Sequence, residues 1–539
     1  MKRTSPHLSL VLSTALCSLA AALAASAAPP LITLAPLSSL RTTPRNNGAV
    51  PPVLSPPGAS IVLAHDAPRQ RLLVVNQASN RVDVIGITDP SAPVVQASLD
   101  MTPYGPFATS VAVHDDLLAV AVTGAAVTDP GSVVFFDADF QHLATVPVGP
   151  LPDMITFTPS GRYLLVANEG EATADYSIDP EGSISRIDVQ NGFQAETIGF
   201  AGFNSQAAVL RASGVRIFGP GATVAQDLEP EWIAVSQDSK TAWVTLQENN
   251  AVAILDINAG TVTSIRALGT KDHGLAINAF DPSDRDSATG SGSIKIGTWP
   301  VEGLYEPDSI EAVRIKGKDY LVIANEGSAR DAAGPGNEAG RLATLTLDPV
   351  RFPNALDLKK NANLGRLNVS KATGDTDGDG DIDSIQGFGS RSFSILDASG
   401  AMIWDSGSQF ETILAALYPL NFNCSNSNNT LDDRSDDKGP EPEGVALGKA
   451  FGRDYAFISL ERIGGFFVYD ISTPAAPEFV QYVNNRDFTV APALDTAGDL
   501  GAEGTAFIKA DDSPNGSPLL VVANEVSGTT TIFEVVKQP

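Results

Sequence analysis

The sequence predicts an all-β protein, a seven-bladed β-propeller with long loop inserts. The first observation is a repeated unit, in which an acidic or polar start leads into an apolar strand, a turn, a second apolar strand that ends in Asn or Glu, and a third strand. The second observation is that this unit recurs seven times. The third is composition, because β-branched strands alternate with turn residues such as Ser-Gly and Asn-Gly. One unit cannot bury both faces of its small sheet, and radial stacking of the units buries them.

The copies follow one another along the chain, and the first two match the pattern more weakly than the rest. They occupy residues 60–87, 108–136, 152–170, 229–257, 306–331, 441–471 and 502–535. A pair of β-sandwiches or a solenoid is the alternative, but sandwich strands would show no such recurrence.

The N-terminal 27 residues have the features of a secretory signal peptide. Two basic residues precede an Ala- and Leu-rich apolar run, and a small-x-small cleavage sequence follows. An uncleaved anchor is the alternative. Residues 28–57, rich in Pro, Leu and Ser, are expected to be an extended lead-in to a single propeller over 58–539. No later stretch is long and apolar enough to span a membrane, so we expect an extracytoplasmic, soluble monomer.

Two long inserts interrupt the repeats, at about 260–299 and about 331–440. Long loops in a compact domain are usually functional or disordered. The second insert contains one predicted helix, over 408–418. It also contains Cys424, the only cysteine left after signal cleavage, which we expect to be an unpaired thiol.

The formal net charge of −28 makes nucleic acid and anionic lipid improbable partners. Such a surface attracts cations. Acidity is also a common means of staying soluble, which accounts for scattered carboxylates but not for clustered ones.

The densest cluster is DTDGDGDID at 375–383, which aligns with a twelve-residue calcium loop. Its predicted oxygen ligands are Asp375, Asp377, Asp379, Asp381 and Asp383, with Gln386 at the twelfth position. Gly380 falls where the loop needs a sharp turn. Because Gln386 replaces the usual bidentate Glu, either the affinity drops or the twelfth ligand comes from elsewhere. A solvated acidic turn is the alternative, but five like charges would repel one another without a cation. We expect this ion to pin the insert rather than to catalyse.

A second set of acids lies at equivalent points of the repeats. The acids that begin the first strands are Asp153, Glu229, Glu231, Glu306, Asp308, Glu441, Glu443 and Glu503. Those that follow the second strands are Glu169, Glu248, Glu326, Glu461 and Glu525, often beside Asn168, Asn325 or Asn524. In a propeller these positions meet at one mouth of the axis, where like charges require a cation or raised pKa values. Taken singly, each acid could instead cap a strand end and bond backbone amides between blades.

Other chemistries have little support, because the sequence shows no nucleophile elbow, no phosphate-binding loop and no histidine cluster. His273 is the sole candidate acid or base. Near the ring, Lys271, Arg330 and Arg391 are the candidate cations for an anionic substrate.

Several long strings resemble the choice-of-anchor I family of secreted or surface bacterial proteins. They are the repeat at 229–257, KDHGLAINAFDPSDRDS, the segment 301–330, DTDGDGDIDSIQGFGSRSFSI and RSDDKGPEPEGVAL. The resemblance implies a β-propeller that is sometimes described as alkaline-phosphatase-like and is similar in layout to the calcium-dependent propeller phytases. Fold-level likeness is a weak guide to activity.

Two functional hypotheses follow. The first is a calcium-dependent phosphoric ester hydrolase that acts on a phosphorylated small molecule, with Glu306, Asp308, Glu443 and His273 catalytic, Glu231, Glu326 and Glu441 holding Ca²⁺, and Lys271, Arg330 and Arg391 holding phosphate. The second is a non-catalytic, calcium-stabilised propeller that binds an extracellular protein or glycan.

Overall fold

The computed structural model describes residues 32–42, 58–330, 334 and 336–538. The expected signal peptide lies outside these described residues. Within them, no helix combines the length and the hydropathy that crossing a bilayer requires.

Each predicted repeat supplies inner strands of one four-stranded antiparallel sheet. In the first sheet, β2 (Ala59–Asp66), β3 (Arg71–Asn76) and β4 (Arg81–Gly86) come from the repeat, and β5 (Val94–Asp100) completes the outer edge. The apolar strands β3 and β4 are buried on both faces, whereas β5 alternates polar and apolar residues and is largely exposed.

The same order recurs along the chain. The next three sheets are β6 (Ala108–His114), β7 (Leu117–Val122), β8 (Pro130–Asp137) and β9 (His142–Pro150); β10 (Pro152–Phe157), β11 (Tyr163–Asn168), β12 (Ser183–Asp188) and β13 (Gln194–Gly199); and β14 (Pro230–Val235), β15 (Thr241–Leu246), β16 (Ala251–Asp256) and β17 (Thr261–Ala267). Two further sheets are β20 (Ile310–Ile315), β21 (Lys318–Asn325), β25 (Ser392–Asp397) and β26 (Met402–Asp405); and β27 (Pro442–Ala450), β28 (Arg453–Leu460), β29 (Phe466–Asp470) and β30 (Glu478–Val483).

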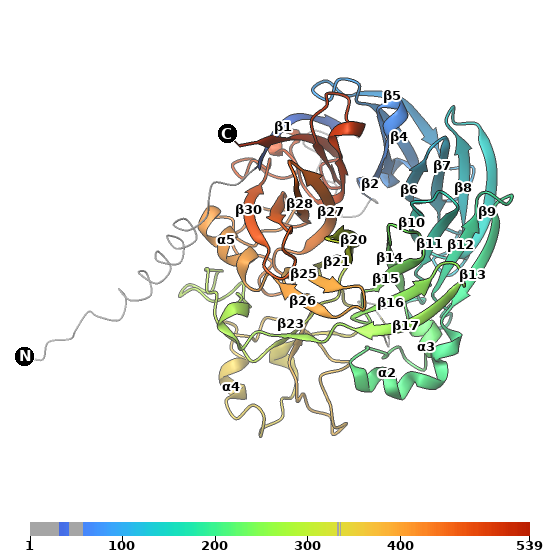
Figure 1. Ribbon diagram of the computed structural model, residues 1–539. Helices are drawn as coiled ribbons and strands as arrows, with labels where there is room; N and C mark the ends of the chain where they lie inside the picture. The colour runs from blue at the N-terminus through green and yellow to red at the C-terminus, as the bar shows by residue number, and fades with distance from the viewer. Residues whose placement is uncertain (1–31, 43–57, 331–333, 335, 539) are drawn as a thin grey trace, which may run out of the picture.

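The first strands of the sheets contact one another in a closed cycle, which runs β2, β6, β10, β14, β20, β27, β31 (Ala502–Ile508) and back to β2. Figure 1 shows the sheets arranged around this common centre. Between neighbouring sheets, apolar faces pack into separate cores, for example Val75 and Val84 of one sheet against Val111 and Val120 of the next. The expected all-β propeller class is confirmed.

The last sheet closes the ring with strands from both ends of the chain. Its order is β1 (Ile32–Arg41), β33 (Thr529–Lys537), β32 (Leu519–Asn524) and β31, with β1 antiparallel to β33. The segment expected to be a lead-in, 28–57, therefore supplies the outer strand of this sheet. Its partner lies at the opposite end of the sequence, so no local pattern could reveal the pairing. Pairing with β1 covers the edge of β33, which would otherwise be exposed.

The two inserts meet in an additional five-stranded sheet that the sequence did not predict. Its order is β18 (Thr270–Asp272), β19 (Glu302–Leu304), β24 (Gln386–Gly387), β23 (Asn368–Ser370) and β22 (Ala339–Arg341). The predicted helix is confirmed as α5 (Gln409–Leu417), and the other described helices are α2 (Ala207–Ser213), α3 (Val224–Asp227) and α4 (Ala355–Leu358). Short 3₁₀ turns are η1 (Ala67–Arg69), η2 (Gln77–Ser79), η3 (Ala201–Gln206), η4 (Ala276–Asn278), η5 (Leu342–Thr344), η6 (Asp495–Ala497) and η7 (Ala510–Asp512). In Figure 1, α4 and β23 lie together below the ring.

Candidate metal centre

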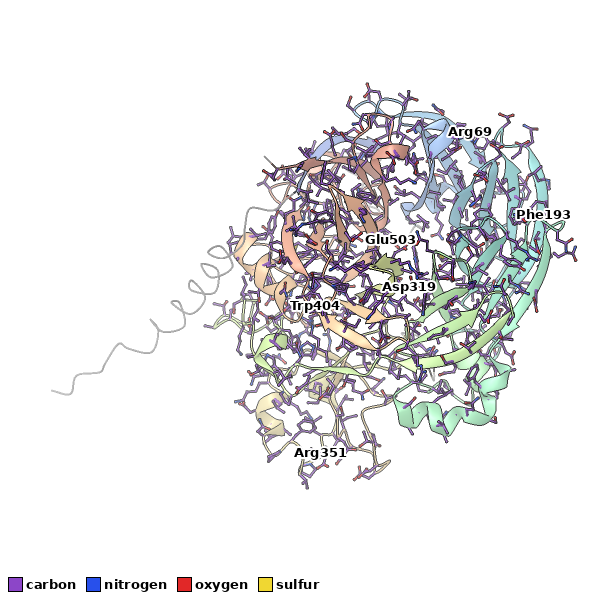
Figure 2. All side chains as sticks on the ribbon, in the orientation of Figure 1. Arg69, Phe193, Asp319, Arg351, Trp404 and Glu503 are labelled. Atoms are coloured by element: carbon purple, nitrogen blue, oxygen red, sulfur yellow. The ribbon has the colours of Figure 1, made fainter. Side chains whose placement is uncertain are left out.

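Acidic side chains at the starts of four first strands occupy β-bulges. Asp153, Glu231, Glu443 and Glu503 each directly follow the first residue of their strand, at points where the ladder register shifts. A bulge leaves a residue unpaired and redirects its side chain. Figure 2 places Glu503 near the middle of the ring. The repeated acids therefore come from a shared local backbone feature, not from surface scatter.

A left-handed residue precedes several of these acids by two positions. Leu151, Glu306, Glu441 and Gly501 have φ values of 47°, 42°, 52° and 69°. Side-chain-bearing residues rarely adopt this conformation, and the surrounding contacts must hold it in place. Glu306 and Glu441 are both completely buried, so their charges also need partners there.

Arg216 neutralises Glu306. Its Nη1 donates to Glu306 Oε1 at 2.7 Å, and the backbone N–H groups of Ser328 and Gly389 both donate to Oε2 at 3.3 Å. Both oxygens of this predicted catalytic residue therefore bond to other parts of the chain. Arg216 also pairs with Glu338, so it joins the segment that precedes β20 to the second insert.

Three cations neutralise Glu441. Arg434, Lys438 and Arg462 approach its carboxylate at 2.7, 3.0 and 2.9 Å. Although burial opposes ionisation, these cations hold the pKa of Glu441 well below its usual range. Glu441 also groups with Glu326 and Glu461 within 4.8 Å, but this group already holds its compensating positive charge.

A different trio is compensated only in part, because the one cation that pairs with its described members, Lys438, is shared with Glu441. Oxygens of Asp308, Glu326 and Glu443 lie within 4.8 Å of one another. Lys438 and Gln247 donate to Glu326, the latter at 2.9 Å. Glu443 is only 8% exposed, and its Oε2 has no hydrogen-bond partner among the described residues. Burial and the neighbouring carboxylates raise the pKa of both Asp308 and Glu443 well above normal. An unpartnered buried oxygen beside two further carboxylates matches the ligand preference of a hard divalent cation such as Ca²⁺.

Glu231 belongs to β14, the neighbour of β20 in the ring, and lines a cavity of about 470 Å³. The charged residues that line the cavity are Glu169, Glu171, Glu229, Glu231, Glu248 and Arg330. The Oε2 atoms of Glu231 and Glu248 are buried without a hydrogen-bond partner among the described residues. Burial, followed by Glu248 and Glu169, raises the pKa of Glu231 well above normal. Glu231 is in none of the close metal-binding groups that the described residues form.

The predicted substrate cations have structural partners. Arg330 bonds to Asp227 at 2.7 Å and to Glu229 at 2.8 Å. Lys271 is 2% exposed and pairs with Asp405 at 2.9 Å. Arg391 is 4% exposed and pairs with Glu411 at 2.6 Å. The structure thus brings only Arg330 to the cavity.

The candidate acid or base His273 is also enclosed. Its Nδ1 lies 2.6 Å from the carbonyl oxygen of Asn278, and its ring packs on Phe280. Burial, assisted by Lys271, lowers the pKa of His273 to about 3. The imidazole therefore stays neutral through the physiological range.

The Asp-rich loop brings its acids together in two overlapping groups. Asp375, Asp377 and Asp383 form one group within 4.8 Å, and Asp381 and Asp383 form another with Asp348. The loop turns sharply, with φ values of 82° at Gly378 and 100° at Gly380. Thr373 donates to the side-chain oxygen of Gln386. Asp379 is in neither group.

Sequence reasoning missed Asp348, Gln247, Lys438 and Arg216. Asp348 reaches the loop because Leu347 forms a parallel bridge with Ile382. Asp348, Lys438 and Arg216 lie outside the repeated positions, whereas Gln247 stands at a repeated position where other copies have Asn.

Comparison with known proteins identifies a matching family. The sequence profile of the choice-of-anchor I domain matches residues 62–474. Gigasin-3a of Magallana gigas is 33% identical over 191 residues, which cover 33% of this chain and 66% of that protein. Among solved structures, Kuenenia stuttgartiensis hydrazine synthase gives a TM-score of 0.46 at 13% identity, covering 91% of this chain and 99% of that one. The Cps50 (Swd1) β-propeller domain of Myceliophteria thermophila gives 0.42 at 10% identity, covering 94% and 100%. The fold assignment rests on the ring of sheets and not on these distant likenesses.

Proposed function

We propose that this chain, which belongs to the choice-of-anchor I family, is a secreted calcium-binding propeller that hydrolyses phosphoric esters at its central carboxylates. In this proposal each four-stranded sheet is one blade, which makes the propeller seven-bladed. The observation that carries the proposal is the trio Asp308, Glu326 and Glu443, in which Glu443 keeps a buried oxygen without a hydrogen-bond partner among the described residues.

Calcium suits the trio because all of its ligand atoms are carboxylate oxygens. When bound, calcium would neutralise a phosphoryl group and polarise it toward attack by water. The chain's own contribution would be to fix the ligands and to hold a proton. Glu326 is held in place by Lys438 and Gln247, while Glu443 retains an unbonded oxygen.

Proton transfer would fall to a carboxylate whose pKa is raised above that of a free carboxyl group. Glu503 is a candidate for this role, because burial and then Glu525 and Asp308 raise its pKa well above normal. It comes from the first strand that follows the Glu443 sheet in the ring. Lys271, Arg391 and His273 would then support the fold instead of contacting substrate, a revision of their roles as first expected.

A second function, non-catalytic binding, is favoured by a separate observation. The cavity of about 470 Å³ is lined by five carboxylates, while its only cation, Arg330, is already paired. Such a cavity would suit a positively charged group of an extracellular partner. Here calcium at the ring and at the Asp-rich loop would only stabilise the scaffold.

The test is hydrolysis by the purified mature protein of phosphomonoesters and phosphodiesters, with added Ca²⁺ and with chelator. The proposal expects calcium-dependent turnover that Glu443→Gln abolishes and that Asp379→Asn, in the loop, leaves intact. No turnover on any ester, from a folded protein that binds calcium through Glu443, would reject the hydrolase and retain the binding function.

A further inference from the structure

A third group of acids lies away from the ring, where the two inserts meet. Oxygens of Asp281, Asp286 and Asp432 lie within 4.8 Å of one another. Asp281 and Asp286 belong to the first insert, and Asp432 belongs to the second. Asp281 and Asp432 are completely buried. Three aspartates from segments far apart in sequence thus converge in the protein interior.

Asp281 accepts hydrogen bonds at both of its carboxylate oxygens, whereas Asp286 and Asp432 each accept at one. Backbone N–H groups of Ser283 and Lys295 donate to Asp281, the N–H of Ser293 donates to Asp286 Oδ1 at 2.7 Å, and the hydroxyl of Ser435 donates to Asp432 Oδ1. Asp286 and Asp432 each keep a second carboxylate oxygen that these bonds do not use. Asp286 Oδ2 and Asp432 Oδ2 are buried and have no hydrogen-bond partner among the described residues.

Two neighbouring aspartates in the same two loops do have a counter-charge. Arg366 bonds to both Asp284, at 2.9 Å, and Asp436, at 2.7 Å. None of the ion pairs among the described residues includes Asp281, Asp286 or Asp432. The adjacent Glu411 supplies no positive charge to the group, because it is itself an acid, and its own charge is neutralised by Arg391. Buried carboxylates without a counter-charge are costly, so a missing cation is indicated.

From this convergence we infer a divalent-cation site, for calcium, formed by Asp281, Asp286 and Asp432 and joining the first insert to the second. The ligand atoms are all oxygens, which is the set that Ca²⁺ prefers and that zinc or copper does not. Ca²⁺ accepts irregular geometry, whereas Mg²⁺ needs a near-ideal octahedron. The first insert supplies two of the three aspartates and the second insert supplies one.

Gly292 shows how closely the loops approach at the site. A Cβ atom on Gly292 would lie 2.5 Å from Cβ and 2.8 Å from Oδ2 of Asp432. The first insert therefore passes directly against the free oxygen of Asp432. An ion here would bridge two loops that otherwise meet through like charges.

The role of this site is structural and independent of the proposed activity. The metal would hold the two inserts together beside the ring, as a cross-link does, and would stabilise only the folded chain. The residues in between, including the Asp-rich loop, are thereby fixed at both ends.

Calcium titration by calorimetry of the chelator-treated protein, with Asp432→Asn and Asp286→Asn compared with wild type, tests the inference. We expect each variant to bind one calcium ion fewer per chain. Asp433→Asn, at the neighbouring position outside the group, is the matched control and should bind as many ions as wild type. An unchanged stoichiometry in both Asp432→Asn and Asp286→Asn would overturn the site.

Thermal unfolding adds a second test, in which the substitution should lower the melting temperature in calcium but not in chelator. In chelator, Asp432→Asn should melt at the same temperature as wild type or higher, because it removes one of three repelling charges; in calcium it should melt lower. A carboxylate with a purely structural role would lower the melting temperature equally in both conditions, which would also overturn the inference. If a variant fails to fold, hydrogen exchange of wild type decides: 281–293 and 422–435 should exchange more slowly with calcium than with chelator, and equal rates count against the site.

Discussion

An oxygen of Glu443 lies within 4.8 Å of an oxygen of Asp308, although the two residues come from neighbouring sheets and no hydrogen bond satisfies Glu443 Oε2 among the described residues. Replacing Glu443 by Gln removes one like charge. In chelator we expect Glu443→Gln to raise the free energy of unfolding, because burial and the neighbouring carboxylates oppose the ionisation of Glu443. In calcium the variant should lose most of the metal-induced rise in melting temperature, which differential scanning fluorimetry measures. A variant that is destabilised in chelator would contradict this view of the trio.

Glu306 should behave in the opposite way. Its carboxylate accepts from Arg216 and from two backbone N–H groups, so Glu306→Gln leaves a buried guanidinium partly uncompensated. We expect a loss of about 3 kcal/mol in unfolding free energy, both with and without calcium. Urea denaturation in the two conditions checks this. A loss that appears only in calcium would instead make Glu306 a metal ligand.

The Asp-rich loop offers a matched pair of substitutions. Asp377 lies in a close group of carboxylates, whereas Asp379, two positions along, lies in none of the groups. Asp377→Ala should remove one bound calcium ion, and Asp379→Ala should weaken binding far less. Isothermal titration calorimetry of the two variants distinguishes them. Equal losses would favour the regular twelve-residue ligand order over the arrangement that includes Asp348.

Arg330 tests whether a cation at the cavity serves substrate or fold. Its guanidinium bonds to Asp227 and Glu229, and all three side chains are buried. Arg330→Met should therefore cost about 3–5 kcal/mol of unfolding free energy by leaving two carboxylates without their partner. Chemical denaturation gives the value. Normal stability combined with a raised KM would restore the substrate role.

The metal-free protein should lose stability as the pH rises. Burial raises the pKa of Asp153 to about 6, of Glu311 to about 7 and of Glu229 to about 8. Between about pH 4, where these groups ionise in the unfolded chain, and about pH 8, the folded state binds more protons, so the free energy of unfolding falls with rising pH. Melting temperatures in chelator at pH 5, 6.5 and 8 measure the fall. Asp153→Asn should flatten the part below about pH 6, and a flat profile in wild type would contradict the burial of these acids.

The repeats account for the success of the fold prediction. Each copy from 60–87 to 502–535 became the inner strands of one sheet, because a short apolar, β-branched run between turn residues favours a buried strand. The strand β1 and the five-stranded sheet were not predicted. Their partners are distant in sequence, and their short strands carry little periodicity of their own.

The residues of the candidate site were likewise predicted only in part. The recurring Glu-Pro-acid pattern marks Glu443 at the start of β27 and Glu306, Asp308 and Glu441 shortly before a first strand, but it could not separate acids with a cation from acids without one. Arg216 and Lys438, which make that separation, come from segments outside the pattern.

The sequence by itself determined the all-β repeat architecture, the family, the strand starts at which acids gather and the turn-forming glycines of the Asp-rich loop. These are local properties, set by side-chain period, backbone conformation and spacing. Only the tertiary structure decided which carboxylates are neutralised, that Lys271, His273 and Arg391 are enclosed, and that Asp281, Asp286 and Asp432 meet. The physical reason is that the charge of a buried group depends on every partner within a few ångströms, and those partners come from segments that the sequence order does not bring together.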